Sequence, residues 1–247
     1  MSFNLINPDH KFLKKYCTGE VIDVGAHIGD YSKFFSRYAK KVHAFEPTES
    51  SYKLLLKNTG KKVFCHSVAL GKEDMVINFY TDGISACNSG VPLEGFNKTS
   101  VMQARLDYFE FSNISLIKID AEGMDYEVLL GGEKTIQRNR PAIFVEVKPS
   151  ALVKRGYSSK DIYDFMKKNN YTTKKIDYCY EGDSYDLLCL PQWKYNIQMD
   201  KKEQFKEDIL SLAEANGITL LDFMEVVFSI ILIEEISLED DSKDTEN

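Results

Sequence analysis

The chain has 247 residues, of which 43% are hydrophobic and 28% are charged, and its formal net charge is −7. Such a length and composition predict one large globular domain, or one domain with an appendage. The negative charge argues against a nucleic-acid partner, because binding to a phosphate backbone needs a basic surface. We expect no membrane span, since no apolar stretch is long enough, and residues 1–16 lack the apolar centre of a signal peptide.

The five cysteines form no C-x-x-C pair and are accompanied by no histidine cluster. This pattern argues against a zinc site and against a disulfide scaffold. We therefore expect reduced thiols and a cytoplasmic protein.

Candidate strands and helices alternate along most of the chain. The expected strands span residues 21–24, 41–46, 62–70, 75–81, 115–120, 141–147, 171–177 and 185–190, and residues 101–105 are expected to form a short extended segment. The expected helices span residues 30–38, 50–58, 106–111, 124–138 and 158–169. Such alternation predicts an α/β fold with a doubly wound, mostly parallel sheet, helices on both faces and an antiparallel edge strand. We expect 75–81 to fold back on 62–70 as an antiparallel arm, and 81–99 to form either a lid or an ordinary surface loop.

The character of the sequence changes after Pro191. We expect a main domain at 1–195, a helical extension at 196–238, and an acidic disordered tail at 239–247. The extension is expected to hold two helices, and the second has an apolar face. That face either packs on the main domain or contacts a partner, for example a second copy in a homodimer.

A glycine turn follows the first expected strand. Asp23, Gly25 and Gly29 form the pattern D-x-G-x-x-x-G, which differs from the G-x-G-x-x-G of dinucleotide-binding folds. Glycine at these positions lets the backbone approach a ligand closely. Because the glycine that would face a pyrophosphate is missing, the turn suits a nucleoside that carries an amino acid better than a dinucleotide.

The second expected strand ends in Glu46, which lies 21 positions after Gly25. An acidic residue near this offset accepts hydrogen bonds from ribose hydroxyls in nucleotide-binding sheets. The glycine turn and Glu46 together therefore predict a nucleoside site.

Further carboxylates lie at the ends of later expected strands: Asp120, Glu122 and Glu146. Ligands of open α/β sheets bind at this edge, where converging carboxylates repel one another unless a cation lies among them. We therefore expect a positively charged ligand. Lys118, inside a buried strand, needs Asp120 or Glu146 as partner unless its ammonium group reaches the strand end.

These segments resemble motif I of class I S-adenosylmethionine-dependent methyltransferases, and more narrowly the FkbM-type methyltransferase family. The resemblance covers roughly residues 18–148, and no family resemblance is assigned from residue 200 onward. The matching segments are 21–29, 42–47, 67–71, 105–107, 116–123, 127–132 and 141–146.

The resemblance implies a seven-stranded Rossmann-like sheet and transfer of a methyl group from S-adenosyl-L-methionine, usually to a hydroxyl oxygen. The acceptor would be a sugar, a glycan or a small metabolite. By position, Gly25, Ala26 and Gly29 would surround the methionine part, with Asp23 in the cofactor-binding set, and Glu46 would bind the ribose. Three residues would flank the adenine, and Asp120 would face the cofactor amino group or the acceptor; the three are Ser67, Val68 and Ala69.

An alcohol is a poor nucleophile, so a base near the acceptor would assist the transfer. Asp120 or Glu146 is the expected base, with Glu122 in support. Alternatively, Asp120 and Glu146 would hold a divalent ion of the magnesium type, although no metal site is predicted. Two other functions stay open: a non-catalytic S-adenosylmethionine-binding or assembly module, and an NAD-dependent oxidoreductase, which the missing G-x-G-x-x-G disfavours.

Overall fold

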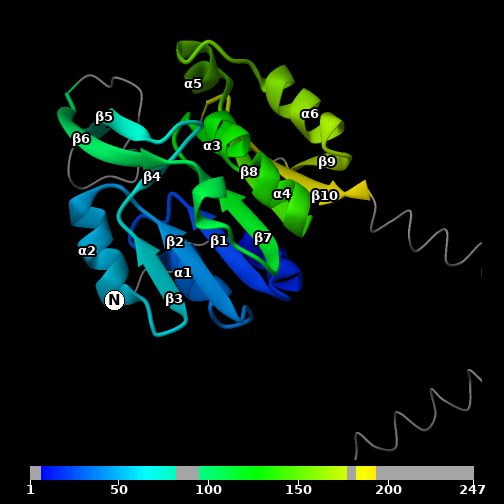
Figure 1. Cartoon of the computed structure of the whole chain (residues 1–247), viewed down its shortest axis with the longest axis horizontal. Helices are drawn as coiled ribbons and strands as arrows, with labels where there is room; N and C mark the ends of the chain where they lie inside the picture. Colours follow the sequence, from blue (N-terminus) through cyan, green and yellow to red (C-terminus); the bar gives the residue numbers. More distant parts are fainter. Residues whose placement is uncertain (1–6, 82–94, 177–181, 193–247) are drawn as a thin grey trace, which may run out of the picture. The chain divides into compact units, whose positions relative to one another are not determined.

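The computed structural model describes residues 7–81, 95–176 and 182–192 (Figure 1). These residues belong to one compact unit, Met1–Gln192. The expected extension at 196–238 and the tail at 239–247 lie outside the described residues, as does most of the expected loop. The division of the chain into these parts, and the homodimer contact, therefore stay predictions.

A seven-stranded sheet forms the centre of the unit, with strand order β3-β2-β1-β7-β8-β10-β9. Strands β3, β2, β1, β7 and β8 are parallel, and β10 is antiparallel to both of its neighbours, β8 and β9. The predicted fold class is confirmed, and the reversed strand lies beside the outermost strand, β9. The strands are β1 (Glu20–Val24), β2 (Lys41–Phe45), β3 (Val63–His66), β7 (Ile114–Ile119), β8 (Ala142–Val147), β9 (Tyr171–Ile176) and β10 (Tyr185–Pro191).

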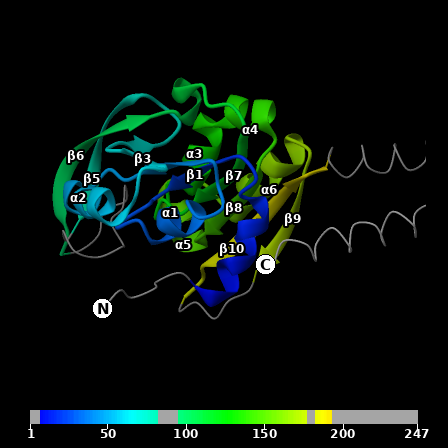
Figure 2. The same ribbon diagram turned by 90° about the horizontal axis from the view of Figure 1, so that it is seen from below.

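Helices cover both faces of this sheet (Figure 2). The 3₁₀ helix η1 (Pro8–Tyr16) and helix α1 (Asp30–Phe35) lie on one face, and helices α3 (Asp125–Gly131) and α4 (Glu133–Asn139) lie on the other. The remaining helices are α2 (Glu49–Asn58), η2 (Leu106–Phe109), α5 (Pro149–Lys154) and α6 (Ser159–Lys168). Within the described residues, no helix is both long enough and apolar enough to cross a membrane.

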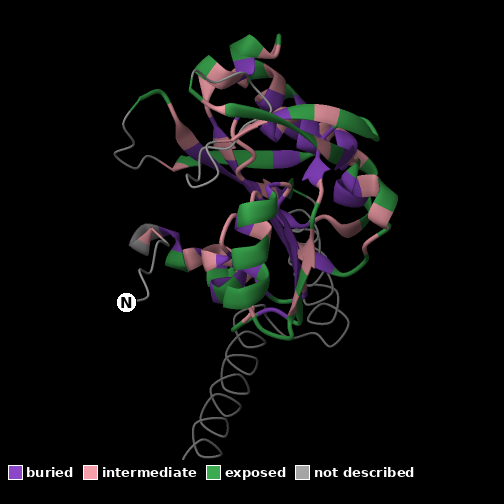
Figure 3. Cartoon of the chain, turned by 90° about the vertical axis from the view of Figure 1, so that its left-hand side faces the viewer, coloured by how far each residue is buried: buried purple, intermediate pink, exposed green. Residues whose placement is uncertain are grey.

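Alternate residues of each strand supply the two halves of the core. In β1, Val21 packs in the cluster that contains Phe35 of α1, whereas Ile22 packs in the cluster that contains Leu129 of α3. The central strands are therefore buried on both faces, and Figure 3 shows them mainly in the colour of buried residues. This double burial explains why the strands read as nearly continuous apolar runs in the sequence.

A second sheet of three strands lies beside the first: β4 (Ala69–Leu70), β5 (Met75–Thr81) and β6 (Asn97–Ala104), in the order β4-β6-β5. The expected strand at 62–70 is therefore divided between two sheets. The expected direct pairing of 75–81 with 62–70 is wrong, because β6 lies between β4 and β5. Strand β6 offers β5 a long antiparallel partner, but its residues 97–100 are polar and exposed, so their sequence does not show a strand.

Several element boundaries differ from the expectations. The expected helix at 124–138 is two helices, α3 and α4, with Gly132 as the junction between them. Gly131 lies close to another segment, since a Cβ there would be 1.9 Å from the carbonyl oxygen of Gly71. Helix α1 ends at Phe35. Helix η1 was not expected, and Leu13 and Cys17 anchor that region in the core. The expected helix at 158–169 is confirmed as α6 with a capping box at Ser158.

Candidate functional site

A cavity of about 290 Å³ opens at the carboxyl ends of β1, β2 and β7. Doubly wound sheets bind their ligands at this edge, beside the point where the strand order reverses, which here is between β1 and β7. The β1–α1 turn, the end of β2, strands β4 and β5 and the β7–α3 loop all contribute to its wall. Of the residues predicted for the site, those that line the cavity are Gly25, Ala26, Glu46, Val68, Ala69, Asp120 and Glu122, whereas Asp23, Gly29, Ser67 and Glu146 are not part of its lining.

The two glycines of the turn serve contacts within the chain. Gly25 has a φ of +73°, and a Cβ there would lie 1.8 Å from the backbone oxygen of Asp120. Gly29 has a φ of +96°, and a Cβ there would lie 2.8 Å from side-chain carbons of Leu55 and Thr59 in and after α2. Both positions require glycine because neighbouring segments pack against the turn. Close approach to a ligand, the reason expected from the sequence, stays a prediction beside these contacts.

Glu46 is only 5% exposed, and backbone groups hold its carboxylate at the cavity wall. The N–H of Thr48 donates to Oε1 at 2.8 Å, and the N–H of His27 donates to Oε2 at 3.0 Å. Burial raises the pKa of Glu46, and the two backbone hydrogen bonds oppose that shift. Because each carboxylate oxygen has two lone pairs, both oxygens can accept a further hydrogen bond from a ligand hydroxyl.

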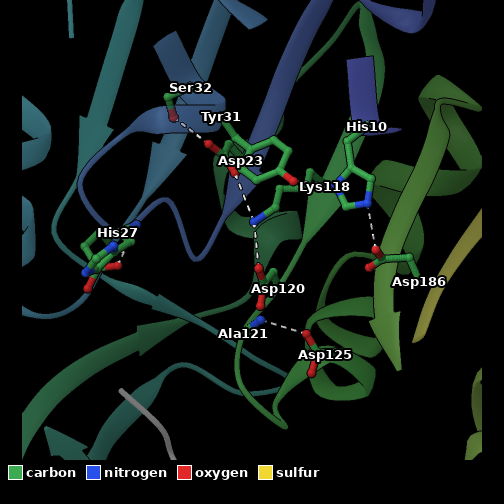
Figure 4. Close-up of polar contacts among 11 residues, drawn as sticks. His10, Asp23, His27, Tyr31, Ser32, Lys118, Asp120, Ala121, Asp125 and Asp186 are labelled. Carbon is green, nitrogen blue, oxygen red and sulfur yellow. Dashed lines mark hydrogen bonds and ion pairs between the residues drawn. The ribbon is translucent and has the colours of Figure 1, made fainter. Parts of the chain in front are cut away.

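Lys118 lies at the centre of a buried polar network (Figure 4). Its Nζ is 3.1 Å from Oδ2 of Asp120 and 3.7 Å from Oδ1 of Asp23, and it lies 4.8 Å from the centre of the Tyr31 ring. The expected pairing with Asp120 is confirmed. The alternative partner, Glu146, is replaced by Asp23, because β1 and β7 pair with Asp23 opposite Lys118.

Opposite charges in this network counteract the effect of burial. Burial by itself would lower the pKa of Lys118, but Asp120 and Asp23 outweigh this effect and the pKa is raised. The side chain of Asp23 is fully buried and also accepts a hydrogen bond from Ser32 at 2.6 Å. Burial raises the pKa of Asp23, and the charge of Lys118 opposes that shift. Asp23 thus lies behind the cavity wall, where it supports Lys118.

The β7–α3 loop presents a second group of acids. Asp125 shapes this loop, since its carboxylate accepts the backbone N–H groups of Ala121 at 2.7 Å and Gly123 at 3.0 Å. Glu122 lies 3.4 Å from Lys148, and burial followed by the charge of Asp120 raises the pKa of Glu122 to about 7.

Glu146 lies at the end of β8 and is not part of the cavity lining. Burial raises its pKa, and the neighbouring charges of Asp120 and Asp125 raise it further. Its carboxyl group is therefore held mainly in the neutral form at neutral pH. Among the described residues, no group of three or more His, Cys, Asp or Glu side chains has an arrangement suited to a metal ion.

Several residues that line the cavity were missed as site residues, and four of them are polar or aromatic side chains at its wall: His27, Asp30, Tyr31 and Phe79. His27 lies between the two glycines of the turn, and Asp30 and Tyr31 directly follow the second, so their place in the chain could have indicated them. Phe79 comes from β5, in the other sheet, and no local signal in the sequence places it there.

A family model, described as the methyltransferase FkbM domain, matches residues 23–173. No curated protein sequence matches the chain. Among solved structures, the chain is similar to the methyltransferase FkbM from Methylobacillus flagellatus KT, with 16% identity and a TM-score of 0.49. That match covers 68% of this chain and 43% of the other, so the chain spans less than half the length of that protein.

Two further structures show similar levels of likeness. An rRNA methylase from Streptococcus thermophilus has 13% identity and a TM-score of 0.49, over 77% of this chain and 98% of the other. A putative methyltransferase from Streptococcus mutans, in complex with SAH, has 14% identity and a TM-score of 0.47, over 77% and 99%.

The family model thus matches more than half of the chain, and all residues that line the cavity fall within the matched segment. The glycine turn, Glu46 and the β7–α3 loop are all included in it. The chain therefore belongs to the FkbM methyltransferase domain family.

Proposed function

We propose that this protein transfers a methyl group from S-adenosyl-L-methionine to a hydroxyl oxygen of a sugar, a glycan or another small metabolite. One observation carries the proposal: a cavity at the strand ends that combines a buried, backbone-held carboxylate, Glu46, with the Lys118–Asp120 pair. Membership of the FkbM family supplies the class of reaction.

The residues of the cavity fit the proposed cofactor. Both carboxylate oxygens of Glu46 have acceptor capacity for the two ribose hydroxyls. Val68, Ala69 and Phe79 offer an apolar wall of the kind that an adenine ring needs. Asp120, at the carboxyl end of β7, provides negative charge for the cationic part of the ligand. When bound, S-adenosylmethionine supplies an electrophilic methyl group on a sulfonium.

The acceptor hydroxyl loses its proton during the transfer, and Glu122 is the base that we propose. Glu122 lines the cavity, and its pKa of about 7 suits proton transfer near neutral pH. Asp120 also lines the cavity, but Lys118 pairs with it at 3.1 Å, which favours a positioning and electrostatic role. Glu146 is not part of the cavity lining, and its raised pKa favours the neutral form. It is therefore a weaker candidate for the base than Glu122.

Titration calorimetry with S-adenosylmethionine, S-adenosylhomocysteine and NAD tests the cofactor. We expect the first two to bind and NAD not to bind. Glu46→Ala should weaken the binding by more than roughly tenfold, because hydrogen bonds to a charged group contribute about 1.5–3 kcal/mol each. Glu49→Ala is the control, since Glu49 is exposed on α2 and pairs with Lys53. Equal affinity of wild type and Glu46→Ala would remove the ribose assignment.

A radiolabelled methyl-transfer assay over a panel of glycans and small alcohols tests the reaction. We expect turnover on at least one hydroxyl acceptor, and a large loss of that turnover in Glu122→Gln with the cofactor affinity retained. Binding without turnover on any acceptor would favour the non-catalytic binding module instead.

A further inference from the structure

A histidine outside the matched family segment contacts the cavity wall through a tyrosine (Figure 4). His10, in η1, is only 3% exposed. Its Nδ1 is hydrogen-bonded to the hydroxyl of Tyr31, at the start of α1, and its Nε2 lies 3.1 Å from Oδ2 of Asp186 in β10. Three segments that are far apart in the sequence therefore meet at one buried imidazole.

The carboxylate of Asp186 determines which way the hydrogen bond runs. A negative charge beside Nε2 favours the tautomer that carries its proton on Nε2, so Nδ1 is the acceptor and the Tyr31 hydroxyl donates. Burial raises the pKa of Tyr31, so the hydroxyl keeps the proton that it donates. The imidazole also packs against the ring of Phe144 in a T-shaped arrangement, with 4.9 Å between the ring centres. These contacts fix the position of the tyrosine hydroxyl.

Tyr31 connects this histidine to the cavity. Tyr31 is part of the cavity lining, and the centre of its ring lies 4.8 Å from Nζ of Lys118. Lys118 in turn holds the Asp120 carboxylate at 3.1 Å, and both of these residues also line the cavity. A displacement of the Tyr31 ring would therefore free the side chains of Lys118 and Asp120 to move at the cavity wall.

We propose that His10 and Asp186 are positioning residues of the cofactor cavity: they hold the Tyr31 ring over Lys118 and so fix the Lys118–Asp120 pair. This inference rests on the proposed function, because it assigns the cavity to S-adenosylmethionine. It extends the site beyond the matched segment 23–173, since η1 and β10 both lie outside it. The N-terminal helix is then part of the binding site and more than a cover of the sheet.

His10→Phe is the main test, because phenylalanine keeps a ring of similar size but offers no acceptor to Tyr31. We expect the Kd for S-adenosylhomocysteine, measured by calorimetry on the full chain, to rise roughly tenfold, as expected when one buried hydrogen bond is lost. His10→Asn should restore most of the affinity, because its side-chain oxygen can accept the same hydrogen bond. Circular dichroism sets a temperature at which every variant is folded.

His43→Phe is the matched control. His43 is also buried and pairs with a carboxylate, Glu20, at 2.9 Å, but it is not part of the cavity lining. Its replacement should lower stability and leave the Kd unchanged. A double-mutant cycle of His10→Phe with Tyr31→Phe should show that the two effects on Kd are not additive, because each removes the same hydrogen bond. Nitrogen NMR of wild-type imidazoles should show His10 with its proton on Nε2.

The outcomes separate this inference from the proposed function. If wild type binds S-adenosylhomocysteine and folded His10→Phe binds it equally well, the positioning role is refuted and the cofactor assignment stands. If the first variant does not fold, an unchanged Kd in Tyr31→Phe refutes the role in the same way. If wild type binds neither S-adenosylmethionine nor its product, the proposed function fails and the inference fails with it.

Discussion

Gly25→Ala should destabilise the protein strongly, because the added methyl group has no room. Two effects contribute. The φ of +73° lies in the left-handed region, which costs a residue with a Cβ about 1–2 kcal/mol. The Cβ would also lie 1.8 Å from the carbonyl oxygen of Asp120, and separating the two turns costs about 1–3 kcal/mol, as in other overpacked sites.

Together these effects predict a loss of about 2–5 kcal/mol, a large part of the stability of a typical domain. Urea unfolding of wild type and variant measures this loss. Gly60→Ala is the control, since nothing lies within 4 Å of a Cβ there, and it should change stability by less than about 0.5 kcal/mol. If Gly25→Ala is as stable as Gly60→Ala, the packing of the turn against Asp120 does not explain the glycine.

Lys118→Met should lower the free energy of unfolding by about 3–5 kcal/mol, because Asp23 would stay fully buried without its cation. Addition of Asp23→Asn should restore part of the loss in urea unfolding, and a single-variant loss below about 1 kcal/mol would contradict the network. A second prediction concerns pH. The folded protein holds a proton on Glu122, whose pKa is raised from 4.5 to about 7, so wild-type stability should fall as pH rises between these values. Glu122→Gln should flatten that decline, and parallel pH curves for the two proteins would argue against the shift.

Local patterns were sufficient for much of the fold. The buried strands β1, β2, β7 and β8 were found because apolar runs bounded by turn residues are evident in the sequence, and α6 was found from its serine cap. The pairing of the small sheet was not predicted, because β4 has only two residues and β6, the partner of β5, begins with the polar stretch Asn97–Ser100. A strand that is stabilised mainly by pairing with a distant segment need not have a hydrophobic pattern in its own sequence.

The candidate site divides in a similar way. Gly25, Glu46 and Asp120 were located from the sequence, because residues at the carboxyl ends of parallel strands meet at one edge whatever the details of packing. The proton on Glu122 was not foreseen, since a pKa depends on burial and on neighbouring charges that come from several segments.

By itself, the order of strands, glycines and acids along the chain determined the class of fold and the edge of the sheet at which a ligand would bind. Only the tertiary structure decided which of these acids face the cavity, that Asp23 joins Asp120 as a partner of Lys118, and that His10 and Asp186 contact Tyr31 and its histidine partner from outside the matched segment. The physical reason is that hydrogen bonds, ion pairs and desolvation act over a few ångströms in space. The residues that take part lie far apart along the sequence, so no local pattern shows that they meet.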